Sequence, residues 1–292
     1  AQNGYYLWQA GLIHLSYDAA SDEITQADLE YITADQVAAE YTPDETVSNL
    51  IDAINRQEEG ILNTVIGTSP VKMLYAWEDV RRGETDIGQF VTASYLEATG
   101  ADLAIENAGG IRSGLPHGEV KYGDVISISP YGNLVVTKQL TGAQIQEMLE
   151  ISLDITLRNL AAYEGQLSML EQGASSQEAQ MAYPFPEESG SALQVSGAVI
   201  TYDPTAEYGS RIQSVTIGGT ALQAGRLYTV AGNSYLVTDD TYPMLASASV
   251  AHEYGTCEEA IRDLLLQGED AVVSAVEGRV WQVASVQPEE PV

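Results

Sequence analysis

Asp102-Leu-Ala-Ile-Glu106 is a short apolar run that leads into the small residues of Asn107-Ala-Gly-Gly-Ile-Arg112. The apolar run is typical of a strand. The glycines after it allow the backbone to approach a ligand closely, and the guanidinium of Arg112 offers a fork of donors for a carboxylate, a phosphate or ribose hydroxyls. A glycine-rich turn is more often only a tight turn, so this stretch by itself is a weak indication of a binding loop.

Helix signals lie on both sides of this stretch. Asp86 is expected to cap a helix that ends near Gly100, a residue suited to a left-handed C-terminal turn. Thr141 and Gln144 form a capping box, which predicts the start of a helix that runs to about Leu157. A similar box predicts a last helix over residues 258–266.

Strand signals are interspersed with these helices, at residues 65–67, 124–129, 134–140, 199–202, 212–217, 228–231 and 280–283. Turn residues separate the three runs between 199 and 231, which we therefore expect to be antiparallel strands. Helices and strands mix without a regular βαβ order. The sequence thus predicts an α+β (mixed α/β) fold.

The chain divides into a short N-terminal part and one large domain. Two extended runs around a turn predict a hairpin, which is marginal in isolation. A helix with one apolar stripe, which we expect to be buried, follows it. The predicted segments are a hairpin in 1–40, a connecting helix in 41–63, the main domain in 64–285 with a long Gly-, Ser- and Pro-rich inserted loop at 158–193, and a tail at 286–292.

Composition limits the classes of partner. Twelve Lys and Arg against 42 Asp and Glu give a net charge of −30. Such a chain lacks the basic surface that non-specific nucleic-acid binding requires, so no nucleic acid polymer is expected as a partner. Hydrophobic residues make up 45% of the chain, which indicates a folded core. No run approaches the roughly 20 apolar residues of a membrane span.

Motifs for catalysis and metal binding are missing. His14, His117 and His252 lie far apart, and no histidine or cysteine stands near them at metal-ligand spacing. A nucleophile elbow and a phosphate-binding glycine-lysine loop are also absent. The pair Asp239-Asp240 is more readily explained as a solvated acidic loop than as a metal site. The sequence therefore predicts no catalytic residue and no metal site in this chain.

Two tyrosines lie at predicted strand ends. Tyr131 stands in Ser129-Pro-Tyr-Gly-Asn133 and Tyr235 in Gly232-Asn-Ser-Tyr-Leu236. Aromatic rings on turns can clamp a flat ligand, and stacking on a base contributes about 1–3 kcal/mol. In a chain with 17 tyrosines, burial of the rings with wet hydroxyls is the commoner explanation.

Taken in order, these motifs resemble the C-terminal domain of the 5'-nucleotidase family. The resemblance covers roughly residues 62–283, interrupted near 158–193, and implies a 5'-nucleotidase C-terminal-domain-like fold with mixed sheets flanked by helices. The motifs are Asn107-Ala-Gly-Gly-Ile-Arg-Ser113, Gly123-Asp-Val125, Ser129-Pro-Tyr-Gly-Asn133, Leu140-Thr-Gly-Ala-Gln144, Val195-Ser-Gly-Ala-Val-Ile-Thr-Tyr-Asp203, Gly209-Ser-Arg-Ile212, Tyr228-Thr-Val230, Asn233-Ser-Tyr-Leu236 and Glu277-Gly-Arg-Val280.

The resemblance implies that this domain grips a nucleoside or nucleotide. Relatives stack the base between two aromatic residues, usually Phe, and hold the ribose and phosphate with polar side chains. The matching positions here are Tyr131 and Tyr235 for the stacking pair, Asn107 and Arg112 for the polar ligands of the loop, Arg81 for a phosphate-side arginine, and Asp240 for an acid that contacts the ribose.

The resemblance also implies a second, N-terminal metallophosphoesterase domain that holds two divalent metals and activates water. Residues 1–40 resemble its last strands, and residues 41–63 its linker helix. The motifs that bind those metals are not in this chain, so we expect it to bind ligand without hydrolysing it. The parent enzyme would convert nucleotides, 2',3'-cyclic ones among them, to nucleoside and phosphate. An extracellular, periplasmic or cell-surface location is implied in the same way.

The alternative is a non-catalytic ligand-binding or surface-interaction module that kept the fold. Thr238-Asp-Asp-Thr-Tyr242 replaces a glycine-rich segment of many relatives, and Gln89 stands where some carry arginine; both departures favour this alternative. The retained set of Tyr131, Tyr235 and Arg112 favours nucleotide recognition.

Overall fold

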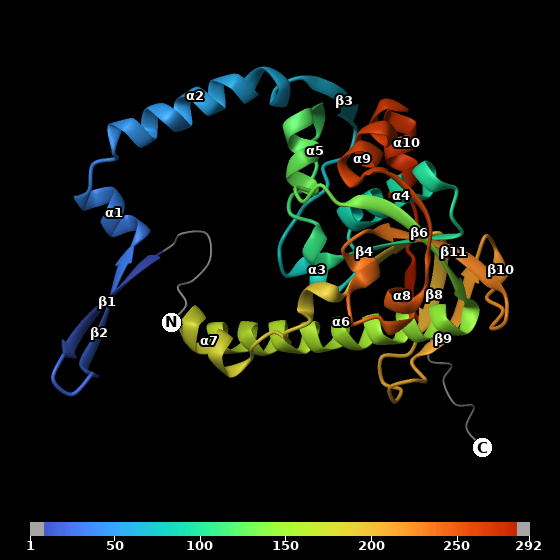
Figure 1. Ribbon diagram of the computed structural model, residues 1–292. Coiled ribbons are helices and arrows are strands. Elements are labelled where there is room, and N and C mark those ends of the chain that lie inside the picture. The colour runs from blue at the N-terminus through green and yellow to red at the C-terminus, as the bar shows by residue number, and fades with distance from the viewer. Residues whose placement is uncertain (1–8, 285–292) are drawn as a thin grey trace. The chain divides into compact units, whose positions relative to one another are not determined.

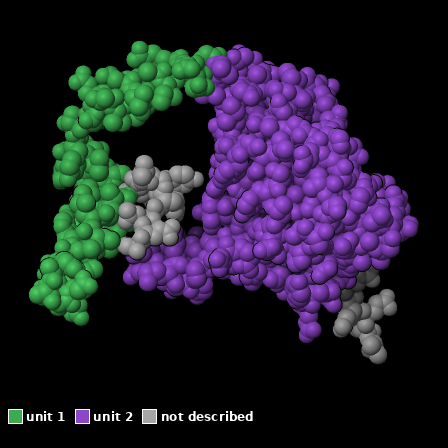
Figure 2. All heavy atoms as spheres, viewed as in Figure 1, with its two compact units in different colours: residues 1–60 green, residues 61–292 purple. Residues whose placement is uncertain are grey.

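The computed structural model describes residues 9–284 of the chain. It divides into two compact units, residues 1–60 and 61–292, which Figure 2 shows in different colours. Within the described residues, no helix combines the length and the apolar character needed to cross a membrane. The predicted tail at 286–292 lies outside the described residues.

The first unit contains the predicted hairpin. β1 (Gln9–Asp18) pairs antiparallel with β2 (Glu23–Thr33), and α1 (Ala34–Glu40) begins at a capping box formed by Thr33 and Gln36. α2 (Glu45–Leu62) lies within the range 41–63 in which a helix was predicted, and its role as a connection to a second domain stays a prediction. The expected burial of its apolar stripe is wrong for the described chain, because no residue of α2 is buried. The assignment of this unit to a second domain stays a prediction.

A mixed five-stranded sheet in the order β12-β6-β11-β4-β7 forms the centre of the second unit. Its strands are β4 (Leu103–Asn107), β6 (Leu134–Thr141), β7 (Leu193–Ser196), β11 (Leu227–Asn233) and β12 (Val250–Thr256). β4 and β11 run parallel, whereas the other neighbours are antiparallel. The predicted α+β fold with mixed sheets is therefore confirmed.

A second sheet has the order β10-β9-β8-β13, and a third pairs two strands. The bounds are β8 (Ala198–Tyr202), β9 (Ile212–Ile217), β10 (Thr220–Ala221) and β13 (Trp281–Val283), with β3 (Val65–Ser69) and β5 (Gly118–Lys121) in the third. β8 and β9 are antiparallel, as predicted. The predicted run at 228–231 belongs instead to the central sheet, because β11 lies between β4 and β6.

Helices cover both faces of the central sheet (Figure 1). The side chains of β4 alternate: Leu103 and Ile105 enter an apolar cluster with α6, and Ala104 enters one with α4 and α9. The helices of this unit are α3 (Asp79–Arg82), α4 (Asp86–Thr99), α5 (Tyr122–Ile128), α6 (Gly142–Glu171), α7 (Ser176–Ala182), α8 (Pro243–Ser247), α9 (Cys257–Leu266) and α10 (Glu269–Ala275).

The prediction of an inserted loop at 158–193 is wrong, because most of that segment is helical. α6 continues to Glu171 and α7 folds back beside it. Gly165 does not end α6, since the ring of Tyr183 packs where a side chain at that glycine would lie. Asn159 is fully buried and donates to the carbonyls of Arg81 (2.8 Å) and Ser189 (3.1 Å). Tertiary packing therefore outweighs the local glycine signal.

Two local predictions also need correction. Residues 124–129 are not a strand: residues 124–128 belong to α5 and Ser129 caps its end, because the Asp124 carboxylate accepts from the Lys121 backbone N–H (2.8 Å) and caps the start of a helix. The cap of α4 is Thr85, whose hydroxyl accepts from the N–H of Gly88 (3.1 Å), and not Asp86. The left-handed Gly100 and the box of Thr141 and Gln144 are confirmed.

Candidate functional site

A cleft of about 560 Å³ lies in the second unit. Its volume is typical of sites for small molecules. The lining residues come from the end of β4 and the loop after it, the turn before β6, the segment that precedes β7 and the turn after β11: Asn107, Gly109, Gly110, Arg112, Tyr131, Asn133, Glu187, Glu188, Gly190, Ser191 and Tyr235. Four of the six residues predicted from the sequence, Asn107, Arg112, Tyr131 and Tyr235, are thus brought together.

The two tyrosines present their side chains to this cleft. Tyr131 is 51% exposed and Tyr235 is 60% exposed. The two rings are therefore not buried at strand ends, which is the commoner explanation for such residues. Two exposed aromatic side chains on one cleft provide surfaces on which a flat ring can stack.

Arg112 is tied to the first of these tyrosines. Its Nε donates to the Tyr131 hydroxyl (2.5 Å), and the guanidinium carbon lies 5.5 Å from the ring centroid. The backbone N–H of Arg112 donates to the carbonyl of Ile128 (2.9 Å), which fixes the end of the glycine-rich loop. The hydroxyl of Tyr131, absent from phenylalanine, thus helps to orient the arginine.

Arg81 lies behind the cleft and does not line it. It is 4% exposed, donates to the carbonyl of Trp77 (2.8 Å) and stacks on that ring at 3.9 Å. Desolvation lowers the pKa of Arg81, and the nearby charge of Arg112 lowers it further. A side chain at Gly190, which lines the cleft, would lie 3.8 Å from Arg81 Nη2. The positive charge of Arg81 therefore lies close to that glycine.

Asp240 is exposed and does not line the cleft. Its neighbour Asp239 is closer, because its carboxylate accepts from the hydroxyl of Ser191 (3.0 Å), a lining residue, and from the N–H of Thr241 (2.9 Å). Gln89 is buried and contacts Glu84 away from this cleft. Of these two aspartates, Asp239 is thus the one with a link to the cleft.

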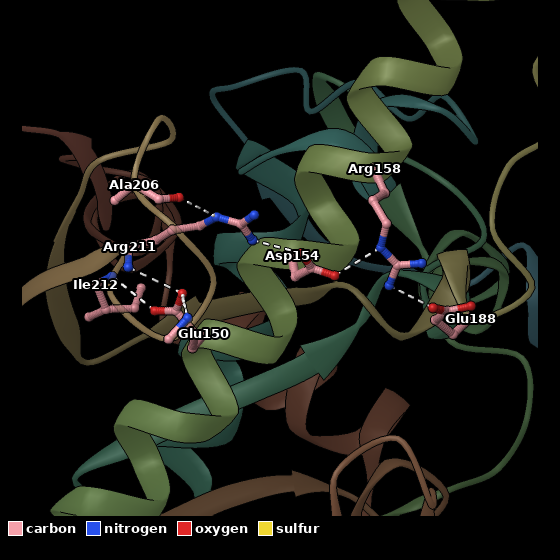
Figure 3. A network of polar contacts seen from close by, with 8 residues as sticks. Glu150, Asp154, Arg158, Glu188, Ala206, Arg211 and Ile212 are labelled. Atoms are coloured by element: carbon pink, nitrogen blue, oxygen red, sulfur yellow. Dashed lines mark hydrogen bonds and ion pairs between the residues drawn. The ribbon is translucent and has the colours of Figure 1, made fainter.

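Sequence reasoning missed the lining residues of 187–191. An ion pair joins Glu188 to Arg158 of α6 (2.6 Å), and Arg158 also contacts Asp154 (2.9 Å), as Figure 3 shows. Asp154 in turn pairs with Arg211 (2.7 Å). The sequence signal that could have indicated a helix at this position is the spacing of Asp154 and Arg158, which are four residues apart, as is typical of a helical ion pair.

The same helix holds the start of β9. The carboxylate of Glu150 accepts the backbone N–H groups of Gly209 (2.7 Å), Arg211 (3.2 Å) and Ile212 (3.0 Å), also drawn in part in Figure 3. α6 therefore connects one side of the cleft to the second sheet through charged side chains.

A buried carboxylate lies beneath the glycine-rich loop. Glu106 is 2% exposed and accepts from the Asn233 amide (2.7 Å) and the Tyr95 hydroxyl (2.9 Å). Burial raises the pKa of Glu106 to about 7, although these two hydrogen bonds oppose the shift. This group does not face the cleft, and no sequence pattern distinguished it from the rest of the strand.

Among the described residues, no group of three or more His, Cys, Asp and Glu side chains could hold a metal ion. The two divalent metals expected in a second domain stay a prediction.

Comparison with known proteins identifies the domain. Residues 65–247 match the family described as "5'-nucleotidase, C-terminal domain". The chain is 28% identical to the trifunctional nucleotide phosphoesterase protein YfkN of Bacillus subtilis (strain 168), over 91% of this chain and 17% of that protein. It is also 28% identical to protein UshA of Escherichia coli (strain K12), over 37% of this chain and 20% of that protein. The chain thus corresponds to a small part of these relatives.

Solved structures agree on the fold. A putative 5'-nucleotidase from Staphylococcus aureus, in complex with alpha-ketoglutarate, matches with a TM-score of 0.69 and 20% identity, over 94% of this chain and 50% of that one. A 5'-nucleotidase precursor from Thermus thermophilus matches with a TM-score of 0.59 and 22% identity, over 96% of this chain and 50% of that one. The family match covers residues 65–247, which is more than half of the chain. The chain therefore belongs to the 5'-nucleotidase C-terminal domain family.

Proposed function

We propose that this chain recognises nucleosides and nucleotides, as the substrate-binding domain of a phosphohydrolase that releases phosphate from nucleotides. One observation carries the proposal: two exposed tyrosines and Arg112 line a single cleft of about 560 Å³. Membership of the family and the name of the YfkN relative support it.

In the proposed complex, the base stacks between Tyr131 and Tyr235, and Arg112 and Asn107 hold the ribose and phosphate side. Arg81 adds positive charge close to Gly190. These two arginines matter because the chain carries a net charge of −30 and Glu187 and Glu188 line the same cleft. The ribose contact predicted for Asp240 is left out of the proposal, since that side chain does not line the cleft.

The proposal assigns bond cleavage to a separate metallophosphoesterase domain that holds two divalent metals. This chain then contributes binding and orientation. A location outside the cytoplasm belongs to the same proposal.

Calorimetric titration of the chain with adenosine and with adenosine monophosphate tests the proposal. Two stacking faces at about 1–3 kcal/mol each give an affinity on the order of millimolar. Tyr235→Ala should abolish binding of both ligands, and Arg112→Ala should weaken the monophosphate more than adenosine. Unchanged adenosine binding by Tyr235→Ala would contradict the clamp.

The alternative, an interaction module that kept the fold, is favoured by the position of Asp240 outside the cleft. It predicts that the folded wild-type chain binds neither ligand at high millimolar concentration. The same titration therefore separates the two proposals.

A further inference from the structure

Asn233, at the end of β11, joins two sides of the cleft from beneath. It is 1% exposed, and its amide nitrogen donates both to Glu106 (2.7 Å) and to the side-chain oxygen of Asn107 (2.9 Å). Its own side-chain oxygen accepts the backbone N–H of Leu236 (2.7 Å), the residue after Tyr235. One amide thus holds a lining residue of the glycine-rich loop and the turn that carries a stacking tyrosine.

Glu106 extends this arrangement toward the other tyrosine. The Tyr95 hydroxyl donates to its second oxygen (2.9 Å), and the thiol of Cys257 lies beside Tyr95. The backbone N–H of Cys257 donates to the carbonyl of Asn133 (2.8 Å), in the turn that carries Tyr131. A buried polar chain therefore runs beneath the cleft from one aromatic turn to the other.

The glycine-rich loop rests directly on this chain. A side chain at Gly110 would collide with the Glu106 carboxylate. Glu106, Asn233 and Tyr95 are removed from water, so breaking one of their hydrogen bonds leaves a buried partner unsatisfied, and the loss is larger than at the surface. The position of the loop is thus coupled to the bond between Glu106 and Asn233.

We infer that Glu106 and Asn233 are a positioning pair, which fixes the loop of Asn107 and Arg112 relative to the turn of Tyr235. The pair touches no ligand and acts through the residues that do. The inference rests on the proposed function for the identity of the ligand, but the positioning itself can be measured without one.

The test measures amide hydrogen exchange in the segments 105–113 and 233–241 of the full chain, with all variants compared at pH 8. Asn233→Asp keeps the acceptor for Leu236 and replaces the donor to Glu106 and Asn107 by an oxygen. We expect exchange in both segments to rise on the order of tenfold. Adding Glu106→Gln restores a donor opposite Asp at position 233, and the Asn107 amide can turn to donate as well. The double variant should therefore return toward wild-type exchange.

Asn159→Asp is the matched control. Asn159 is equally buried but donates to the carbonyls of Arg81 and Ser189. If Asn159→Asp raises amide hydrogen exchange, adding Glu106→Gln should not lower it again. If Asn233→Asp does not fold, Tyr95→Phe takes its place, because it removes one hydrogen bond to Glu106 and preserves the ring. It should then raise exchange in both segments.

Wild-type exchange in Asn233→Asp, or a defect that Glu106→Gln does not relieve, would overturn the positioning pair. Relief of Asn159→Asp by the same change would also overturn it, since the rescue would then be unspecific. Titration with adenosine completes the experiment. If the wild-type chain does not bind adenosine while the exchange pattern is as expected, the proposed function fails and the positioning pair stands.

Discussion

The two sides of the cleft are held by different chemistry. On one side, Asn107 is anchored by Asn233 and Glu106, which are 1–2% exposed. On the other side, Glu188 is anchored by Arg158, whose side chain is 45% exposed. Buried hydrogen bonds are costly to break and respond to protonation, whereas exposed ion pairs contribute little and are screened by salt.

This difference indicates a division between a fixed side and an adjustable side. The strand end that carries Asn107 belongs to a sheet with both faces covered, so it has little freedom to move. At Glu188 the segment 187–191 is joined to α6 by charged groups in contact with water, whereas Ser189 is held by one buried hydrogen bond from Asn159 (3.1 Å). We expect the first side to set the position of a ligand and the second to adapt to it.

The largest expected effect concerns the fixed side and pH. The pKa of Glu106 is raised from 4.5 to about 7 by burial, so the folded state binds the proton more tightly than the unfolded state. Its contribution to stability is therefore complete below about pH 4.5, falls as the pH rises to about 7, and is constant above that. The shift corresponds to about 3 kcal/mol in the free energy of unfolding.

Urea unfolding of wild type and Glu106→Gln between pH 4 and 8 measures this effect. The glutamine keeps an acceptor for Asn233 and can donate to the Tyr95 hydroxyl, but it does not titrate. The difference between the two curves removes the contribution of the other acidic residues. Curves that stay parallel across this range would show that Glu106 has an ordinary pKa.

A smaller effect is expected on the adjustable side. Arg158→Met removes the ion pairs with Glu188 and Asp154 and keeps most of the aliphatic stem. We expect a loss of about 0.2–1 kcal/mol at low salt, which disappears near 1 M salt. Hydrogen exchange should rise in the segment 183–191 and not in 105–113.

Arg262→Met is the control for this change, because Arg262 pairs with Asp263 (2.7 Å) and lines no part of the cleft. It should leave exchange at 183–191 as in wild type. A loss in Arg158→Met that persists at 1 M salt would mean that packing of the side chain, and not its charge, holds this side.

The sequence predicts those parts of the fold that local patterns determine, and it does not predict those that depend on tertiary contacts. The strand at 102–106, observed at 103–107, and the capping box of Thr141 and Gln144 are local patterns, and both were predicted. The length of α6 was not, because its later turns depend on the burial of Asn159 and on the ring of Tyr183 against Gly165. Local signals cannot report contacts of this kind.

The residues of the cleft were likewise predicted only where they stand in local motifs. Asn107, Arg112, Tyr131 and Tyr235 stand in recognisable motifs, so sequence reasoning found them. Glu188 and Glu106 stand in none, and Asn233 stands in the motif of Tyr235 with no role predicted for it. Glu106 and Asn233 are 127 positions apart, and only the parallel pairing of β4 with β11 brings them together.

A third effect, on ligand binding and not on stability, is expected where the two sides meet the ligand. The Tyr131 hydroxyl accepts from Arg112 Nε (2.5 Å), so Tyr131→Phe removes a contact that orients the arginine and leaves the ring in place. Under the proposed function, adenosine should bind as to wild type, and adenosine monophosphate about fivefold more weakly, as loss of one hydrogen bond of about 1 kcal/mol implies.

Calorimetry with both ligands measures this difference, and Tyr235→Phe is the matched control on the opposite turn. The turn of Tyr131 is held independently of the hydroxyl, because the N–H of Cys257 donates to the carbonyl of Asn133 (2.8 Å). The ring should therefore keep its position in Tyr131→Phe. Equal loss of adenosine and its monophosphate would instead show that the hydroxyl positions the ring, and the fixed side of the cleft would then depend on Arg112 as well as on the buried amide.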